Sequence, residues 1–243
     1  PAARHHEEKG KNAVMVKAGC TNGWVRRVRI VNADSALLLR RAVNVTVSDL
    51  RIDAPNRTPN SAGMFGHYGV MVAEGCREVL VEDVEIRHRY FHDFQVYGSD
   101  LCVFHRSQGV DLNLDHHEGN PTRILWTDLN VGKGTRVFKC GGPTNGPQNG
   151  PGCVFWNLRK GDGSPLSLLP QLDPTQPNFW DRRLAIVGHT QNRLNTDLTK
   201  EWVEGIHPID PPDLYLAQRG LWTPPSVPPT VQFPVGRSVT ATS

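Results

Sequence analysis

Side chains that can carry protons are concentrated in the middle of this chain. Six of its ten histidines lie between His67 and His117, and the densest stretches are 87–93 and 115–120. Histidine exchanges protons near neutral pH, and arginine holds carboxylates in two-pronged contacts. The chain therefore has the residue types for acid–base chemistry on an anionic substrate, provided that its fold brings them together.

The elements that must position these residues repeat along the chain. Short segments alternate apolar and polar residues with a period of two, as strands do. An acid often stands just before the central apolar residue, as at Asp49, Asp83 and Asp128, and these acids are expected to be turn or ladder residues. The central residues are Val28, Leu50, Val84, Val110, Leu129 and Leu158, which are 22, 34, 26, 19 and 29 residues apart.

Such a spacing, scattered around the low twenties, is typical of a solenoid. Further alternations between these rungs, such as 68–72 and 94–97, indicate two or three short strands per coil. A leucine-rich repeat would add a Leu/Asn consensus and a helical segment, which the chain lacks. We therefore predict an all-β fold with a parallel β-helix over 19–160. Its core is expected to contain Val28, Ile30, Leu50, Ile52, Val84, Ile86, Val110, Leu112, Leu129 and Val131.

The two ends differ from this central part. The segment 1–18 is expected to continue coils that lie upstream. The rung pattern stops near Lys160, and twelve of the 19 prolines follow it. We predict that 161–222 is an irregular, proline-rich cover of the solenoid, with a helical turn at 213–218. The segment 223–243 is predicted to be an extended tail.

Counting from the rung centres places several reactive side chains in one column. Residues at equal offsets in successive coils of parallel strands stack about 4.8 Å apart. His92, His117 and Arg136 come seven or eight residues after their rung centres, so we expect them on one face of the solenoid. The side chains expected beside this column are Tyr90, His116 and Lys133.

Such a column could perform β-elimination on a uronic-acid polysaccharide. The reaction needs a cation at the carboxylate, a base for the C5 proton and an acid for the leaving oxygen. His117 is the expected base or acid, with His116 or Tyr90 as its proton-transfer partner, and His92 has the same chemistry.

The same reaction requires cationic groups that bind the substrate. Arg136 or Arg123 could clamp the carboxylate, and Lys133 is a further candidate for substrate binding. The sequence thus offers all three chemical functions on one predicted face.

The rung pattern over about 19–160 resembles the right-handed parallel β-helix superfamily of pectate-lyase-like proteins. This resemblance implies an extended glycan bound across one face of the solenoid, and it favours a polysaccharide lyase. The chain departs from the best-known pectate-lyase pattern because it has no obvious cluster of three acidic calcium ligands. Calcium is therefore left open as a cofactor, and no metal-ligating residue is predicted.

Two other functions stay open. The solenoid could be a non-catalytic scaffold or glycan-binding module in an extracellular protein assembly. A glycoside hydrolase would need a pair of carboxylates, and the candidates are Asp93, Asp111, Asp115 and Glu118. Asp115 could equally orient a neighbouring imidazole or form an Asx turn.

Charge and cysteine usage bear on the partners and the compartment. The 27 Lys and Arg against 24 Asp and Glu give a formal net charge of +3, which argues against a nucleic-acid partner. No run of 18 apolar residues is present to span a membrane. Cys140 and Cys153 bracket a Gly/Pro-rich loop and are predicted to form a disulfide. With glycosylation sequons at Asn44 and Asn56, these features predict a secreted, extracellular protein.

Overall fold

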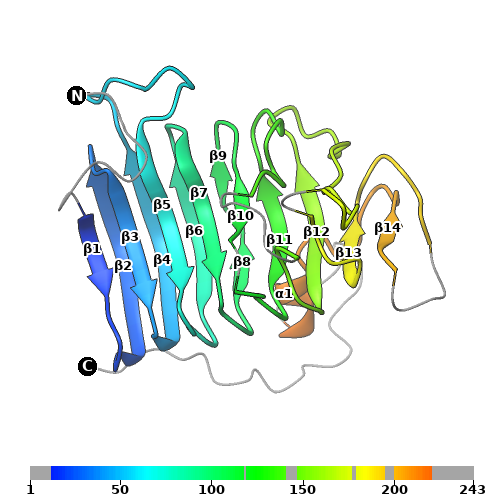
Figure 1. Ribbon diagram of the computed structural model, residues 1–243, viewed down its shortest axis with the longest axis horizontal. Helices are drawn as coiled ribbons and strands as arrows, with labels where there is room; N and C mark the ends of the chain where they lie inside the picture. Colours follow the sequence, from blue (N-terminus) through cyan, green and yellow to red (C-terminus); the bar gives the residue numbers. More distant parts are fainter. Residues whose placement is uncertain (1–11, 118, 141–146, 177–178, 195–199, 221–243) are drawn as a thin grey trace.

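The computed structural model describes residues 12–117, 119–140, 147–176, 179–194 and 200–220, and Figure 1 shows their arrangement. These residues form strands joined by turns and longer loops, together with one short helix, α1 (Leu214–Gln218). The fold is all-β, as predicted. In this part of the chain no helix is long and apolar enough to cross a membrane.

Two sheets run along the molecule, and all the ladders between their strands are parallel. From β1 to β11 the chain alternates between the sheets, except that β8 and β9 both belong to the nine-stranded sheet, so each coil adds to both sheets (Figure 1). This topology is solenoid-like. The five-stranded sheet consists, in order, of β1 (Asn12–Val16), β3 (Ser35–Arg40), β5 (Gly66–Ala73), β7 (Tyr90–Tyr97) and β10 (Leu114–His116).

The other sheet has nine strands. Its order is β2 (Thr21–Val31), β4 (Val43–Asp53), β6 (Leu80–Ile86), β8 (Val103–His105), β11 (Leu125–Asn130), β12 (Cys153–Arg159), β13 (Leu184–Val187) and β14 (Trp202–Glu204). The short strand β9 (Gln108–Gly109) pairs with both β6 and β11. The last three strands of this sheet therefore extend beyond the end of the five-stranded sheet.

The register of the nine-stranded sheet follows the predicted rungs in most coils. Val28 pairs with Leu50, and Leu50 with Val84. Further along the sheet, Leu129 pairs with Leu158. Five of the six predicted rung centres thus occupy equivalent positions in successive strands.

In the remaining coil the rung centre is Ser107, and the prediction of Val110 is wrong. The pairing of β9 with β6 sets Ser107 opposite Val84, and Val110 is 45% exposed. The Ser107 hydroxyl accepts a hydrogen bond from the Val84 amide and donates one to the His105 carbonyl. A hydroxyl satisfied in this way can occupy a buried rung, and a search for apolar alternation passes over it.

The Asp or Asn that precedes four of the rung centres has a backbone role. Asp49, Asp83, Asp128 and Asn157 have φ between 53° and 57°, the left-handed region that Asp and Asn tolerate better than most side chains. Because they are equivalent in register, they bend each strand at the same point. This agrees with the turn role expected for the three acids.

The hydrophobic core lies between the two sheets. Eight of the ten residues predicted to point inward are buried, whereas Val28 is only partly buried. Aromatic rings fill the later coils: Phe104 stacks on Trp126 at a centroid distance of 4.0 Å, and Phe155 lies parallel to Trp126 at 6.5 Å. The coils that carry the candidate site therefore rest on a well-packed interior.

Part of the predicted C-terminal cover crosses the outer face of the nine-stranded sheet. Trp156 donates its indole N–H to the Pro211 carbonyl at 2.8 Å, and the Leu214 amide donates to the Thr127 hydroxyl at 2.9 Å. Asp213 caps α1 by accepting from an amide in its first turn. Helix α1 thereby lies against β11 (Figure 1).

The predicted disulfide between Cys140 and Cys153 is not formed, and both thiols are free. Each cysteine is buried in the protein interior, where Cys140 Sγ faces the Phe138 carbonyl and Cys153 Sγ faces that of Pro121. Burial raises the pKa of Cys153 to about 12 and that of Cys140 well above its usual value. The two side chains serve as core residues, so the loop between them is not closed by a covalent bond.

Candidate functional site

Three polar side chains meet on the outer face of the five-stranded sheet. His92 lies on β7, and Asp115 and His117 lie on or directly after β10, the neighbouring strand. Successive side chains of a strand point to opposite faces, so Asp115 and His117 share the outer face and the intervening His116 points into the core. We refer to His92, Asp115 and His117 as the His–Asp–His cluster.

The Asp115 carboxylate joins the members of this cluster. Its Oδ2 atom lies 2.7 Å from Nδ1 of His92 and 3.3 Å from Nδ1 of His117. The same oxygen accepts a hydrogen bond from Nε2 of Gln95 at 2.9 Å, across the β7–β10 ladder. The two imidazole rings are nearly perpendicular, at 88°, with centroids 5.5 Å apart.

The electrostatics of the cluster keep Asp115 ionised. Burial of this carboxyl favours its neutral form, but the contacts from His117 and His92 outweigh that effect and hold its pKa well below the usual range. Asp115 is fully buried, whereas the His117 side chain is 27% exposed and that of His92 is 5% exposed. Of the three groups, His117 is thus the one that a bound molecule can reach most directly.

Aromatic side chains surround the cluster. The Tyr68 ring stacks on His92 at a centroid distance of 5.3 Å, and His67 stacks on Tyr68 at 3.8 Å. On the other side, the Tyr97 ring lies 6.2 Å from His117. Burial, and after it the charge of the nearby carboxylate, raises the pKa of Tyr68 to about 12. Tyr68 therefore keeps its proton at neutral pH and can donate it.

Two residues predicted to act beside His117 lie in the core instead. His116 is fully buried and its Nε2 accepts a hydrogen bond from the Trp126 indole at 2.9 Å. Burial lowers the pKa of His116 to about 3, so its ring is neutral. Tyr90 is also fully buried, and its hydroxyl donates to the Ala33 carbonyl at 3.2 Å. The expectation that either of them is the proton-transfer partner of His117 is therefore wrong.

Arg136, the expected carboxylate clamp, is held inside the protein. Its guanidinium lies 3.1 Å from the Asp93 carboxylate and donates to the carbonyls of Tyr90 and Phe91 at 2.6 and 3.0 Å. Only 6% of the side chain is exposed. The predicted column is therefore wrong for Arg136, which is buried, whereas His92 and His117 do share the outer face of the five-stranded sheet.

The other two predicted cations lie elsewhere on the surface. Arg123 forms an ion pair with Asp100, with Nε 2.7 Å from Oδ1, and this pairing helps to lower the pKa of Asp100. Lys133 is exposed in the turn after β11. Within the part of the chain that the structure describes, neither hydrogen-bonds to the His–Asp–His cluster.

The candidate glycosylation sites and the candidate acids of a hydrolase occupy varied positions. Asn44 donates its side-chain amide to Asn22 at 2.7 Å, whereas Asn56 is exposed. Asp93 and Asp111 are buried, and burial raises the pKa of Asp93 despite its pairing with an arginine. Glu118 lies outside the described residues.

On the nine-stranded sheet, a further histidine lies between two carboxylates. His105 Nδ1 lies 2.9 Å from Asp213, and its Nε2 lies 2.9 Å from Glu82. Burial opposes protonation, but Asp213 and then Glu82 outweigh it and raise the pKa of His105. Because Tyr215 of α1 packs 4.8 Å from this fully buried ring, the arrangement serves to dock α1 on the sheet.

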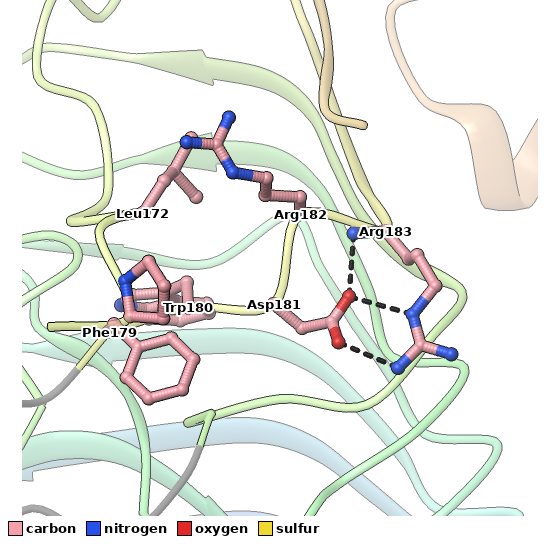
Figure 2. A pocket seen from close by; sticks show the side chains of 7 residues that line it. Leu172, Phe179, Trp180, Asp181, Arg182 and Arg183 are labelled. Atoms are coloured by element: carbon pink, nitrogen blue, oxygen red, sulfur yellow. Dashed lines mark hydrogen bonds and ion pairs between the residues drawn. The ribbon is translucent and has the colours of Figure 1, made fainter. Parts of the chain in front are cut away.

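The structure also has an open pocket of about 400 Å³ (Figure 2). Its two arginines are engaged: Arg183 pairs with Asp181 at 2.6 Å, as Figure 2 shows, and Arg182 donates to Glu201 at 3.0 Å. Trp180 forms part of its wall. Because its charges are mutually compensated, this pocket is less suited to acid–base chemistry than the His–Asp–His cluster.

Sequence reasoning found the two histidines but missed the residues that organise them. Gln95 and Tyr68 were not singled out, although the strand alternation already contains both. Tyr68 pairs with His92 and Gln95 pairs with Asp115, so knowledge of the exact register would have identified them. Comparison with family models, curated proteins and solved structures finds no match to this chain.

Proposed function

We propose that this protein is a secreted, carbohydrate-active, right-handed parallel β-helix of the pectate-lyase-like type. In this proposal it cleaves a uronic-acid-containing polysaccharide by β-elimination at the His–Asp–His cluster. The alternating parallel sheets are compatible with such a fold, and the His–Asp–His cluster lies on the outer face of one of them.

The observation that carries the proposal is the shared carboxylate of Asp115. Nδ1 of His117 faces that carboxylate at 3.3 Å, so an ionised Asp115 favours the tautomer with its proton on Nδ1. Nε2 of His117 then carries the lone pair of the ring and can act as a base. A carboxylate that fixes an imidazole in this way is a recurring arrangement in proton-transfer catalysis.

In the proposed reaction, His117 removes one proton from the substrate and Tyr68 supplies another. His117 Nε2 takes the C5 proton of the uronate, the C4–C5 double bond forms, and the bond from C4 to the leaving oxygen breaks. Tyr68, which retains its proton at neutral pH, gives that proton to the leaving oxygen. His92 lies between these two groups, with ring contacts to both, and acts as a positioning residue.

A panel of uronate polymers tests the proposal, because elimination produces an unsaturated sugar that absorbs in the ultraviolet. His117→Ala is expected to lower the rate by a factor of about 10² to 10⁴. The matched control is His88→Ala, because His88 also lies beside a carboxylate, 2.9 Å from Asp53, but outside the cluster. Near-normal turnover by folded His117→Ala would refute the assignment. If the wild-type protein releases no unsaturated product from any uronate polymer, the lyase proposal fails and the scaffold alternative is favoured.

A hydrolase is less well supported by this geometry. The described candidate acids, Asp93, Asp111 and Asp115, are all at most 2% exposed and are engaged by protein groups. Hydrolysis would need two carboxyl groups that face the scissile bond. Release of saturated reducing ends without ultraviolet absorbance would favour hydrolysis over elimination.

A further inference from the structure

The His–Asp–His cluster has the donor set of a transition-metal site. Each of its three residues offers one ligand atom, and these atoms all lie within 4.8 Å of one another. Two imidazole nitrogens and one carboxylate oxygen form the set that zinc and divalent iron take in many proteins, with further coordination positions open to water or substrate. Small adjustments would bring the three atoms around one ion, since a Zn–N or Zn–O bond is about 2.0–2.2 Å long.

The surroundings of the cluster are also those of a metal site. Its residues come from adjacent strands of one sheet, which fixes the spacing between them. Gln95 donates a hydrogen bond to the Asp115 carboxylate at 2.9 Å, and metal ligands are commonly oriented by such outer hydrogen bonds. His117 is 27% exposed, so an ion can enter from the side of the solvent.

We propose that His92, Asp115 and His117 bind one divalent transition-metal ion of the zinc class. Calcium does not fit this cluster, because it takes six to eight oxygen ligands and two of the three donors are nitrogens. The residues of this cluster therefore do not support the calcium cofactor that the sequence left open.

Metal binding would also regulate the proposed reaction. An ion that takes the lone pair of His117 leaves that ring unable to accept a proton, so zinc is expected to inhibit β-elimination. This inhibitory consequence rests on the proposed function, whereas the binding itself does not.

Titration calorimetry of the full chain without an affinity tag, using zinc chloride, tests the binding. Wild type is expected to bind one ion per chain at this site, and calcium chloride is expected to give no signal. His92→Ala, Asp115→Asn and His117→Ala should each abolish this binding, and Gln95→Ala should weaken it by about 10- to 100-fold. His88→Ala, the matched control, should bind as wild type does.

Cobalt(II) gives a second, spectroscopic readout of the bound ion. Its visible absorption bands report the ligands, so the spectrum should change in folded His92→Ala and His117→Ala. A variant in which His5 and His6 are replaced removes the two adjacent histidines near the start of the chain and should retain the wild-type cobalt spectrum. One-to-one zinc binding that survives in both cluster variants, or no binding by wild type, would overturn the metal site.

The two proposals fail in distinguishable ways. Zinc binding without any release of unsaturated sugar would leave the metal site standing and refute the lyase. Cleavage without zinc binding would do the reverse. Where both occur, zinc should inhibit cleavage and a chelator should restore it, and activation by zinc would overturn the regulatory part.

Discussion

The proposed division of labour between Asp115 and His117 predicts that their substitutions are not additive. His117→Ala removes the base and is expected to cost a factor of about 10² to 10⁴ in rate. Asp115→Asn keeps the size of the side chain, but its amide can donate to Nδ1 of His117 and so favour the unproductive tautomer. Its cost should therefore fall in the same range. Because the carboxylate acts only through the imidazole, the double variant should be no slower than His117→Ala.

The loss of rate in the double variant distinguishes coupled action of Asp115 and His117 from independent action. Two groups that act independently would multiply their effects, giving a loss of about 10⁴ to 10⁸ in the double variant. The double-mutant cycle needs four proteins: wild type, His117→Ala, Asp115→Asn and the double variant. For each, the initial rate of increase in ultraviolet absorbance is measured on a uronate polymer. Asp115→Asn also weakens contacts of a buried charge, and we expect it to lower the free energy of unfolding by about 1.5–3 kcal/mol. Urea titrations should therefore confirm that each variant is folded. A loss of rate in the double variant equal to the product of the two single losses would refute the coupling between Asp115 and His117.

Three further predictions concern the scaffold. The pKa of His105 is raised in the folded state, so its stabilising effect is complete below its unfolded pKa of about 6.5 and is lost as the pH rises through the folded value. The melting temperature of wild type relative to Asp213→Asn, which keeps a capping side chain, should therefore be highest below about pH 6.5 and decrease as the pH rises above it. A difference that does not change with pH would contradict the docking role. Asp49→Val should lower the free energy of unfolding by about 1–2 kcal/mol, because φ at Asp49 is 53° and a β-branched side chain is strained there. Asp49→Gly should not lower it. Equal stability of these two variants in urea would count against the left-handed bend. Mass spectrometry of unreduced, alkylated protein should find Cys140 and Cys153 both modified, and a cross-linked peptide pair would show that they are joined.

The sequence predicts the repeating part of this fold well because burial imposes the repeat. Residues such as Leu50 and Val84 recur where each strand crosses the core, and apolar alternation detects them directly. Ser107 escapes detection because hydrogen bonds, rather than apolar contacts, satisfy it. The error then spreads, because counting from Val110 instead of Ser107 shifts every later offset in that coil by three residues.

The candidate site depends on information that apolar periodicity does not contain. His92 and Asp115 are 23 residues apart, so their contact follows only from the register between two coils. Arg136 has the right chemistry for a carboxylate clamp, yet it is engaged by Asp93, a buried partner that offset counting did not identify. Residue type thus predicts which chemistry is available, while register and burial decide which groups can use it.

The position of the His–Asp–His cluster follows from where the five-stranded sheet ends. In the described part of the chain β10 is its last strand and pairs only with β7, although the nine-stranded sheet continues through β14. Side chains on an interior strand have neighbours on both sides, whereas those on the last strand have them on one. His117, which directly follows β10, is 27% exposed, whereas His92 on the interior strand β7 is 5% exposed and Asp115 within β10 is fully buried. A site that needs one reachable imidazole and a second one held fixed can therefore be built from two adjacent coils, where strand pairing holds His92 and Asp115 in place and the position just past the end of β10 leaves His117 accessible.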